Sequence, residues 1–120
     1  DPANTPRGQR VLATMRAVCL ALPATSEGTQ FGSPVWRVGK RVFARAYCQH
    51  EGWRAAFWAG TDQQALLTQD PRYSIPAYLG HNGWIALEVA RAHRVTELRA
   101  LALTSYQHFA LKRTLARLHK

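Results

Sequence analysis

The side chains that could take part in catalysis are few and do not combine into a known type of site. The five histidines, at positions 50, 81, 93, 108 and 119, fall mainly in predicted turns or near the chain end. His81 stands out because it lies in a turn beside aromatic residues, but no nucleophile or carboxylate is spaced to work with it. We therefore predict neither catalytic residues nor an enzymatic activity.

Metal-binding and phosphate-binding motifs are also absent from the sequence. It contains no HxH, HExxH or CxxC spacing for a metal ion, and no Walker-type or GxGxxG phosphate loop. The acidic residues stand singly, which argues against a hydrolase that uses paired carboxylates. The sequence thus predicts no cofactor and no metal.

Arginine is the functional residue type that the sequence favours. Lysine and arginine number 16 against seven acidic residues, a net charge of +9, and thirteen of the sixteen are arginine. Planar guanidinium groups suit phosphate recognition because they form two hydrogen bonds at once. A polyanionic partner is indicated, although a coding bias towards GC-rich codons would also raise the arginine content.

The basic residues gather in a predicted hairpin and at the end of the last helix. Phe43 and Tyr47 share one predicted strand face with Arg41 and Arg45, and interleaved basic and aromatic side chains can bind nucleic acid. Alternatively, helices bury these aromatics, and the helix-end cations only stabilise the helix dipole. The residues predicted to bind nucleic acid, DNA in particular, are Arg37, Lys40, Arg41, Arg45, Arg54, Lys112, Arg113 and Arg117.

A second hypothesis places a binding pocket in the segment 73–84. Exposed aromatic side chains often mark binding sites, so this segment could hold a small molecule or a protein partner. The same side chains could instead close the open end of the sheet. The pocket residues of this hypothesis are Tyr73, Tyr78, His81 and Trp84.

Two periodicities in the hydrophobic pattern predict the elements that position these residues. Apolar residues at helical spacing follow Thr5 and Pro6, a typical N-cap and first helical residue, and end before Pro23. Alternation with a period of two predicts an antiparallel meander of strands over 35–38, 41–49 and 53–59. The later elements are expected to be a helix at 61–67, an irregular segment at 73–78, a strand at 84–89 and one continuous helix at 95–118.

Length and composition limit the class of protein. A chain of 120 residues, 47% of them hydrophobic, predicts one domain over 1–120, with residues 1–6 as a disordered or trimmed terminus. No apolar run reaches the roughly 18 residues of a membrane span, and residues 1–10 lack the apolar core of a signal peptide. Cys19 and Cys48 have no metal or redox spacing and are expected to be reduced. We predict a cytoplasmic protein, monomeric and without a membrane partner.

Four segments resemble the MmcQ/YjbR family of small bacterial proteins. Residues 31–44, FGSPVWRVGKRVFA, are similar to the family's FGxPxFRVxGKxFA, and residues 20–27, LALPATSE, to its LALPGTxE helix end. Residues 70–87, which contain DPRY and GHNGWIAL, are similar to DPRFxxxxYxGxxGWVxL. Ser105–Tyr106 with the later Lys112–Arg113 resembles DSYxxxxPKR. The resemblance covers about residues 10 to 115 in one order.

The resemblance implies an α+β fold of the frataxin-like type, with an antiparallel sheet and the N-terminal and C-terminal helices packed on one of its faces. It also implies DNA binding, because the family is labelled as predicted DNA-binding proteins with a double-wing motif. It brings no established substrate, cofactor or catalytic residue. Iron delivery by frataxin relies on an acidic first helix, whereas Arg7, Arg10 and Arg16 occupy that helix here, so we expect no iron site.

The sequence departs from the family pattern at three points. Residues 57–60 are apolar where the family has a Ser-Leu-Lys-like stretch, so a cation expected there is missing. Arg94 stands where an aspartate usually caps the closing helix, which leaves Glu97 as one half of a capping box. Ala110 and Leu111 stand where the family usually has Ala-Pro.

Overall fold

The first helix forms where the N-cap signal and the apolar stripe coincide. The computed structural model describes residues 4–50, 52–77, 82–89 and 93–119. Helix α1 spans Pro6–Cys19, and the Thr5 hydroxyl accepts a hydrogen bond from the Gly8 amide at 3.0 Å. This bond satisfies one of the free amides of the first turn. Thr5 and Pro6 therefore begin the helix, as the N-cap signal predicts, and the range 1–6 expected as a disordered or trimmed terminus extends too far.

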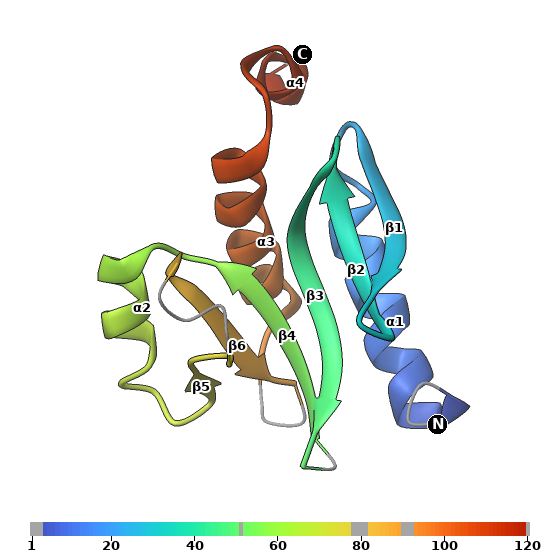
Figure 1. Cartoon of the computed structure of the whole chain (residues 1–120), viewed down its shortest axis with the longest axis vertical. Helices are drawn as coiled ribbons and strands as arrows, with labels where there is room; N and C mark the ends of the chain where they lie inside the picture. Colours follow the sequence, from blue (N-terminus) through green and yellow to red (C-terminus); the bar gives the residue numbers. More distant parts are fainter. Residues whose placement is uncertain (1–3, 51, 78–81, 90–92, 120) are drawn as a thin grey trace.

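Six strands form one antiparallel sheet in the order β1-β2-β3-β4-β6-β5 (Figure 1). The strands are β1 (Thr25–Gln30), β2 (Ser33–Val38), β3 (Arg41–Gln49), β4 (Gly52–Trp58), β5 (Tyr73–Ser74) and β6 (Trp84–Glu88). The helices are α1, α2 (Thr61–Leu67), α3 (Val95–Phe109) and α4 (Lys112–Ala116), and a 3-10 helix follows at Arg117–His119. This is the α+β fold that the sequence predicts.

Helices α1 and α3 pack against one face of the sheet and against each other (Figure 1). Met15 and Leu98 from the helices and Trp36, Phe57 and Ile85 from the strands have no exposed surface. Each such side chain contributes about 1.5–3 kcal/mol by leaving water. The prediction that the terminal helices cover one face is confirmed, and we term the opposite side of the sheet the open face. It carries Val35, Arg37, Arg45, Tyr47, Arg54, Ala56, Trp84 and Ala86.

A β-bulge in β3 decides which of its side chains reach the open face. Consecutive residues 36 and 37 of β2 pair with residues 44 and 42 of β3, so Phe43 is an extra residue in the ladder. Its ring turns to the helix side, where it meets Tyr106 edge-on at 5.6 Å between ring centroids. Phe43 therefore does not share a face with Arg45 and Tyr47. Before the bulge the alternation is shifted, so Arg41, which pairs with Val38, does not share their face either, and the prediction from simple alternation is wrong at both residues.

The hydroxyl of Ser105 lies where β3 and β4 separate. Pairing between these strands ends at Ala44 and Phe57. Beyond that pair, the Ser105 hydroxyl donates to the Phe43 carbonyl at 2.6 Å and accepts from the Trp58 amide at 3.0 Å. The side chain thus satisfies two backbone groups that would otherwise be buried without partners. It also fixes α3 to both strands.

Two neighbouring contacts tie the first helix to the sheet. The Tyr106 hydroxyl donates to the Pro23 carbonyl at 2.6 Å, which joins α3 to the turn after α1. The carboxylate of Glu27 accepts from the Arg16 guanidinium at 2.8 Å and from the Trp36 indole at 3.0 Å. Glu27 on β1 therefore connects α1 and β2.

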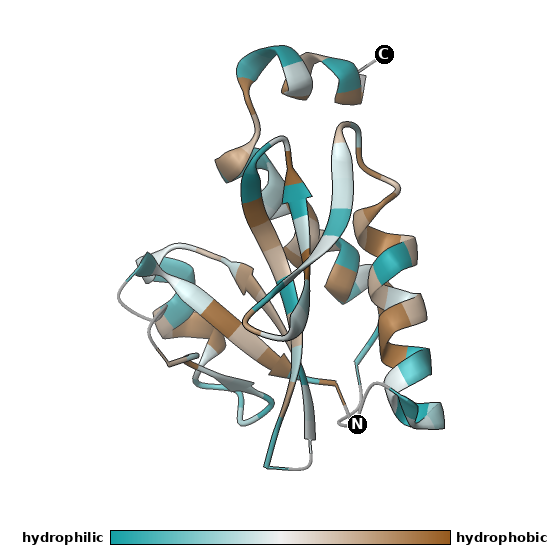
Figure 2. Ribbon diagram, turned by 45° about the vertical axis from the view of Figure 1, so that its right-hand side comes forward, coloured by the Kyte–Doolittle hydropathy of each residue, from teal (hydrophilic) through white to brown (hydrophobic). Residues whose placement is uncertain are grey.

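Three elements differ from the sequence prediction. The pattern does not predict β1, because residues 25–30 are polar and an edge strand can form through backbone pairing without a hydrophobic face (Figure 2). The short β5 lies in the segment expected to be irregular. The closing helix is interrupted, because Ala110 and Leu111 are extended, with ψ of 148° and 152°. This break lets Leu115 and Leu118 pack against the core.

Replacing Ser105 with alanine should destabilise the fold. The Phe43 carbonyl and the Trp58 amide would lose their partner, and a decrease of about 1–3 kcal/mol in the free energy of unfolding is expected. Urea unfolding followed by circular dichroism measures it. The control is Thr104→Ala, which removes an exposed hydroxyl from the same helix and should change stability by less than about 0.5 kcal/mol. Equal effects of the two substitutions would contradict the role of the bridge.

Candidate functional site

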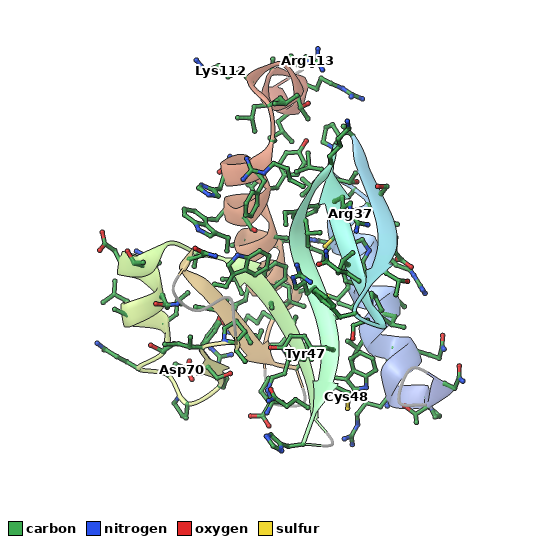
Figure 3. The ribbon with its side chains drawn as sticks, viewed as in Figure 1. Arg37, Tyr47, Cys48, Asp70, Lys112 and Arg113 are labelled. Carbon is green, nitrogen blue, oxygen red and sulfur yellow. The ribbon has the colours of Figure 1, made fainter. Side chains whose placement is uncertain are left out.

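Three arginines form a diagonal row across the open face. Arg37 lies on β2, Arg45 on β3 and Arg54 on β4. On each strand, the arginine is about two positions along from the residue that lies opposite the arginine of the preceding strand. Tyr47 lies opposite Arg54 and on the same face as Arg45; Figure 3 shows Arg37 and Tyr47 on their neighbouring strands. Among the described residues, no carboxylate forms an ion pair with these three side chains. We term them the arginine row.

Glycines make room for two guanidinium groups of the arginine row. A Cβ atom on Gly28 would overlap Nη1 of Arg37, and one on Gly52 would lie 2.8 Å from Nη1 of Arg54. A side chain at either glycine would therefore displace the arginine. The absence of a Cβ lets each guanidinium lie close to the backbone of the sheet, which limits its freedom.

Arg45 occupies the middle of the row. Its guanidinium lies over the Trp84 ring, 5.7 Å from the centroid. Ala56 and Ala86 continue the register of Arg45 across β4 and β6, and their small side chains leave room for it. Burial lowers the pKa of Arg45 and the charge of Arg37 lowers it further, against an opposite effect of Tyr47. A bound anion would relieve both unfavourable effects.

A pocket of about 350 Å³ opens beside the arginine row. Its walls come from the β1–β2 hairpin, the second half of β3 and the segment after β5. The Oε1 atom of Gln30 and the Nε atom of Arg45 are buried and have no hydrogen-bond partner among the described residues. A buried polar group without a partner costs about 1–3 kcal/mol. The lining residues used below are Gln30, Phe31, Arg45, Tyr47, Cys48 and Pro76.

The other five predicted cations lie towards the end of the molecule that holds α4. Figure 3 shows Lys112 and Arg113 there, and Figure 1 shows the β2–β3 turn pointing to the same end. The guanidinium of Arg41, which follows this turn, lies 4.8 Å from the ring centroid of Phe109 at the end of α3. We term this exposed group the end cations: Lys40, Arg41, Lys112, Arg113 and Arg117. The predicted set thus divides into two groups.

The structure does not bring the residues of the second predicted pocket together. Tyr73 pairs with Leu87 and packs in the core on the helix side, whereas Trp84 lies on the open face. Successive residues of a strand point to opposite faces, so Trp84 and Leu87 cannot line one side of the sheet. Tyr78 and His81 lie outside the described residues.

Tyr73 belongs to a charged cluster whose groups already bind one another. Its hydroxyl donates to Glu97 at 2.5 Å, and Arg72 contacts Glu97 at 2.9 Å and Asp70 at 2.8 Å. Burial raises the pKa of Glu97, but hydrogen bonds from Tyr73 and Arg72 outweigh burial and hold this pKa below its usual value. Glu97 thus joins the start of α3 to the turn before β5.

Metal binding and membrane insertion find no support in the residues that the structure describes. They contain no group of three or more histidine, cysteine or acidic side chains placed to hold a metal ion. No helix in this part of the chain combines the length and apolarity needed to cross a membrane.

His108 stacks on Trp58 with ring centroids 3.5 Å apart, and both burial and the charge of Arg41 lower its pKa.

Sequence reasoning singled out only Arg45 and Tyr47 among the residues of the pocket beside the arginine row, and the missed residues include Gln30, Phe31 and Cys48. A signal existed for Phe31, because a bulky aromatic before glycine is unusual in a two-residue hairpin turn. Gln30 gave none, since β1 is not predictable from its pattern. The alternation places Cys48 on the apolar face, where it packs against the core, and nothing in the pattern indicates that it also borders this pocket.

Comparisons with known proteins agree on the fold. A family model described as YjbR matches residues 20–108. The structure is similar to the crystal structure of the Deinococcus radiodurans protein DR2400, family-model domain DUF419, with a TM-score of 0.73. That match has 19% sequence identity and covers 99% of this chain and 91% of the other, so it supports a shared fold alone. No curated protein matches the chain.

The two cysteines should react differently with thiol reagents. Cys19 is fully buried, and burial together with the charge of Glu27 raises its pKa to about 12, so it stays protonated at neutral pH. Cys48 is partly exposed in the pocket wall. An aromatic disulfide reagent should titrate one thiol in the folded protein and both after unfolding, and Cys48→Ser should abolish the reaction of the folded protein. Rapid reaction of both thiols in the folded state would contradict this assignment.

Proposed function

We propose that this chain, which belongs to the YjbR family, binds the phosphate backbone of nucleic acid, DNA in particular, and catalyses no reaction on it. The observation that carries the proposal is the arginine row on the open face. Its three guanidinium groups lie on a face without a helical layer and have no carboxylate partner among the described residues. Guanidinium donors match the spacing of phosphate oxygens.

The distribution of the acidic side chains supports the same proposal. Glu27 pairs with Arg16, and Asp70 and Glu97 pair with Arg72. These three carboxylates therefore neutralise arginines outside the arginine row and outside the end cations, and Glu88 is the described carboxylate that lies opposite a member of the row, Arg54. With a net charge of +9, much of the positive charge is left on surfaces open to a polyanion.

The end cations would add contacts to a long ligand. All five are exposed, and long flexible side chains on a turn and a terminal helix can follow a phosphate backbone. Helix α4 has only five residues and presents no set of asparagine, glutamine and arginine side chains for reading base edges. The proposed binding is therefore electrostatic and without base-pair specificity. It should weaken steeply as salt rises.

The alternative function, a binding module built on the segment 73–84, receives less support. Tyr73 and Trp84 lie on opposite faces of the sheet. The hydroxyl of Tyr73 is already bound to Glu97. Tyr73 and Trp84 therefore cannot contact one ligand from the same side of the sheet.

Three double variants test the proposed function by anisotropy of a labelled duplex between about 50 and 200 mM salt. Arg37→Gln with Arg45→Gln changes the arginine row, and Lys112→Gln with Arg113→Gln changes the end cations. Log affinity falls as log salt rises. Each pair should make this fall less steep, by about 0.9 in slope for every phosphate that the variant no longer neutralises.

The matched control is Arg7→Gln with Arg10→Gln. It removes the same charge from exposed positions of α1, on the helix side of the sheet. This pair should leave the salt slope unchanged. An equal decrease in affinity in all three variants would show that only net charge matters. Binding by the wild type no tighter than by an unrelated basic protein would reject nucleic-acid binding.

A further inference from the structure

Phe31 occupies a position where folding gives it no advantage. It is the first central residue of the two-residue turn between β1 and β2, with φ of 55°, and Gly32 follows with φ of 77°. Positive φ at both central residues favours asparagine and glycine and disfavours a bulky side chain. The side chain of Phe31 is 92% exposed, so no packing offsets this strain. An exposed aromatic ring held in a strained turn points to a binding role.

The surroundings of Phe31 indicate what it would bind. The ring borders the pocket of about 350 Å³ that Gln30, Arg45 and Tyr47 also line, a volume within the range of ~300–1,000 Å³ for small-ligand sites. An aromatic face stacks on a nucleobase, an amide can hydrogen-bond to a base edge, and a guanidinium binds phosphate. All three groups line this one pocket.

We infer that this pocket binds a single unpaired nucleotide, with its base stacked on Phe31 and its phosphate held by Arg45. Arg37, the next member of the arginine row, adds positive charge beside that phosphate. This inference rests on the proposed function and adds to backbone binding a site for an unpaired nucleotide. A free nucleoside 5′-monophosphate offers the same chemistry as one unpaired nucleotide of a strand.

Two features favour a nucleotide over an apolar ligand or an intact duplex. The buried Oε1 of Gln30 and Nε of Arg45 have no partner among the described residues, and an apolar occupant would leave them so. Small rotations of these side chains towards a polar occupant would supply the missing bonds. Inside a duplex, each base is already stacked and paired, so its face cannot reach Phe31 without leaving the helix.

The variant Phe31→Asn tests the inference without endangering the fold. Asparagine suits positive φ, so the melting temperature should stay equal or rise. The affinity for a short single strand should fall about tenfold or more, since stacking on one aromatic side chain contributes that much. The affinity for a duplex of the same sequence should not change. Leu66→Gln, which replaces an exposed apolar residue of α2 by an amide, is the matched control and should alter neither affinity.

Cys48 borders the same pocket from the helix side of β3 and provides a second readout. Its alkylation rate should fall when adenosine 5′-monophosphate is added and should fall less with adenosine or inorganic phosphate alone, because neither fills both parts of the site. Cys19 is buried and does not contribute to the rate. In Phe31→Asn, the nucleotide should no longer protect Cys48.

The outcomes separate the inference from the proposed function. Loss of single-strand but not duplex affinity in Phe31→Asn supports both. Retained duplex binding, with single-strand binding and Cys48 protection unaffected by Phe31→Asn, overturns the inference and leaves the proposed function standing. Protection of Cys48 by the mononucleotide that depends on Phe31, without binding of any oligonucleotide, supports the pocket and overturns the proposed function. Absence of both binding and protection overturns both.

Discussion

The Ser105 hydroxyl bonds the backbone of both β3 and β4 at the point where the pairing of these strands ends, and it fixes α3 there. Because β3 and β4 separate there, the end of α3 reaches past the sheet, and Phe109 contacts Trp84 on the open face with ring centroids 6.1 Å apart. Trp84 in turn lies under the guanidinium of Arg45. Two aromatic rings thus connect the middle of the arginine row to the helix that this buried hydroxyl fixes. The same end of α3 carries the ring beside the Arg41 guanidinium, so one of the end cations contacts it as well.

The motifs that resemble the YjbR family account for the fold better than they account for a function. Glu27 joins α1 to β2, Ser105 joins α3 to two strands, and Tyr106 joins α3 to the turn after α1. Gly83 accepts from the amides of Ala59 and Gly60, so closely that a Cβ on it would lie 2.8 Å from the Gly60 Cα atom. These residues are needed for packing and hydrogen bonding whatever the protein binds. A function has to be argued from the open face itself.

Much of the fold can be predicted from the sequence, because a helix or strand that buries one face has apolar residues at regular spacing. Strands β2, β3, β4 and β6 and the start of α1 are predicted from that period. The bulge at Phe43 is not, since the alternation reads through it and only pairing with β2 reveals the extra residue. The helix break at Ala110 is not predictable because no proline follows it in the sequence. The break instead accompanies the packing of Leu115 and Leu118 against the core. The pocket brings together residues 30, 45 and 76 from separate segments, and no local pattern contains that information.

The open face combines two costs that folding alone does not explain. The first cost is charge repulsion, because the charge of Arg37 acts on the partly buried guanidinium of Arg45. The second is backbone strain, because Phe31 in the β1–β2 turn has a positive φ while its ring is exposed to water. A duplex would neutralise the charge but would leave the ring of Phe31 unused. A small apolar ligand would cover the ring but would leave Gln30 and Arg45 without partners. An unpaired nucleotide, which carries a base and a phosphate a few bonds apart, satisfies both requirements in one site. Because the positive charge and the strained turn lie on the same face, a ligand that carries both a phosphate and an exposed base fits this site best.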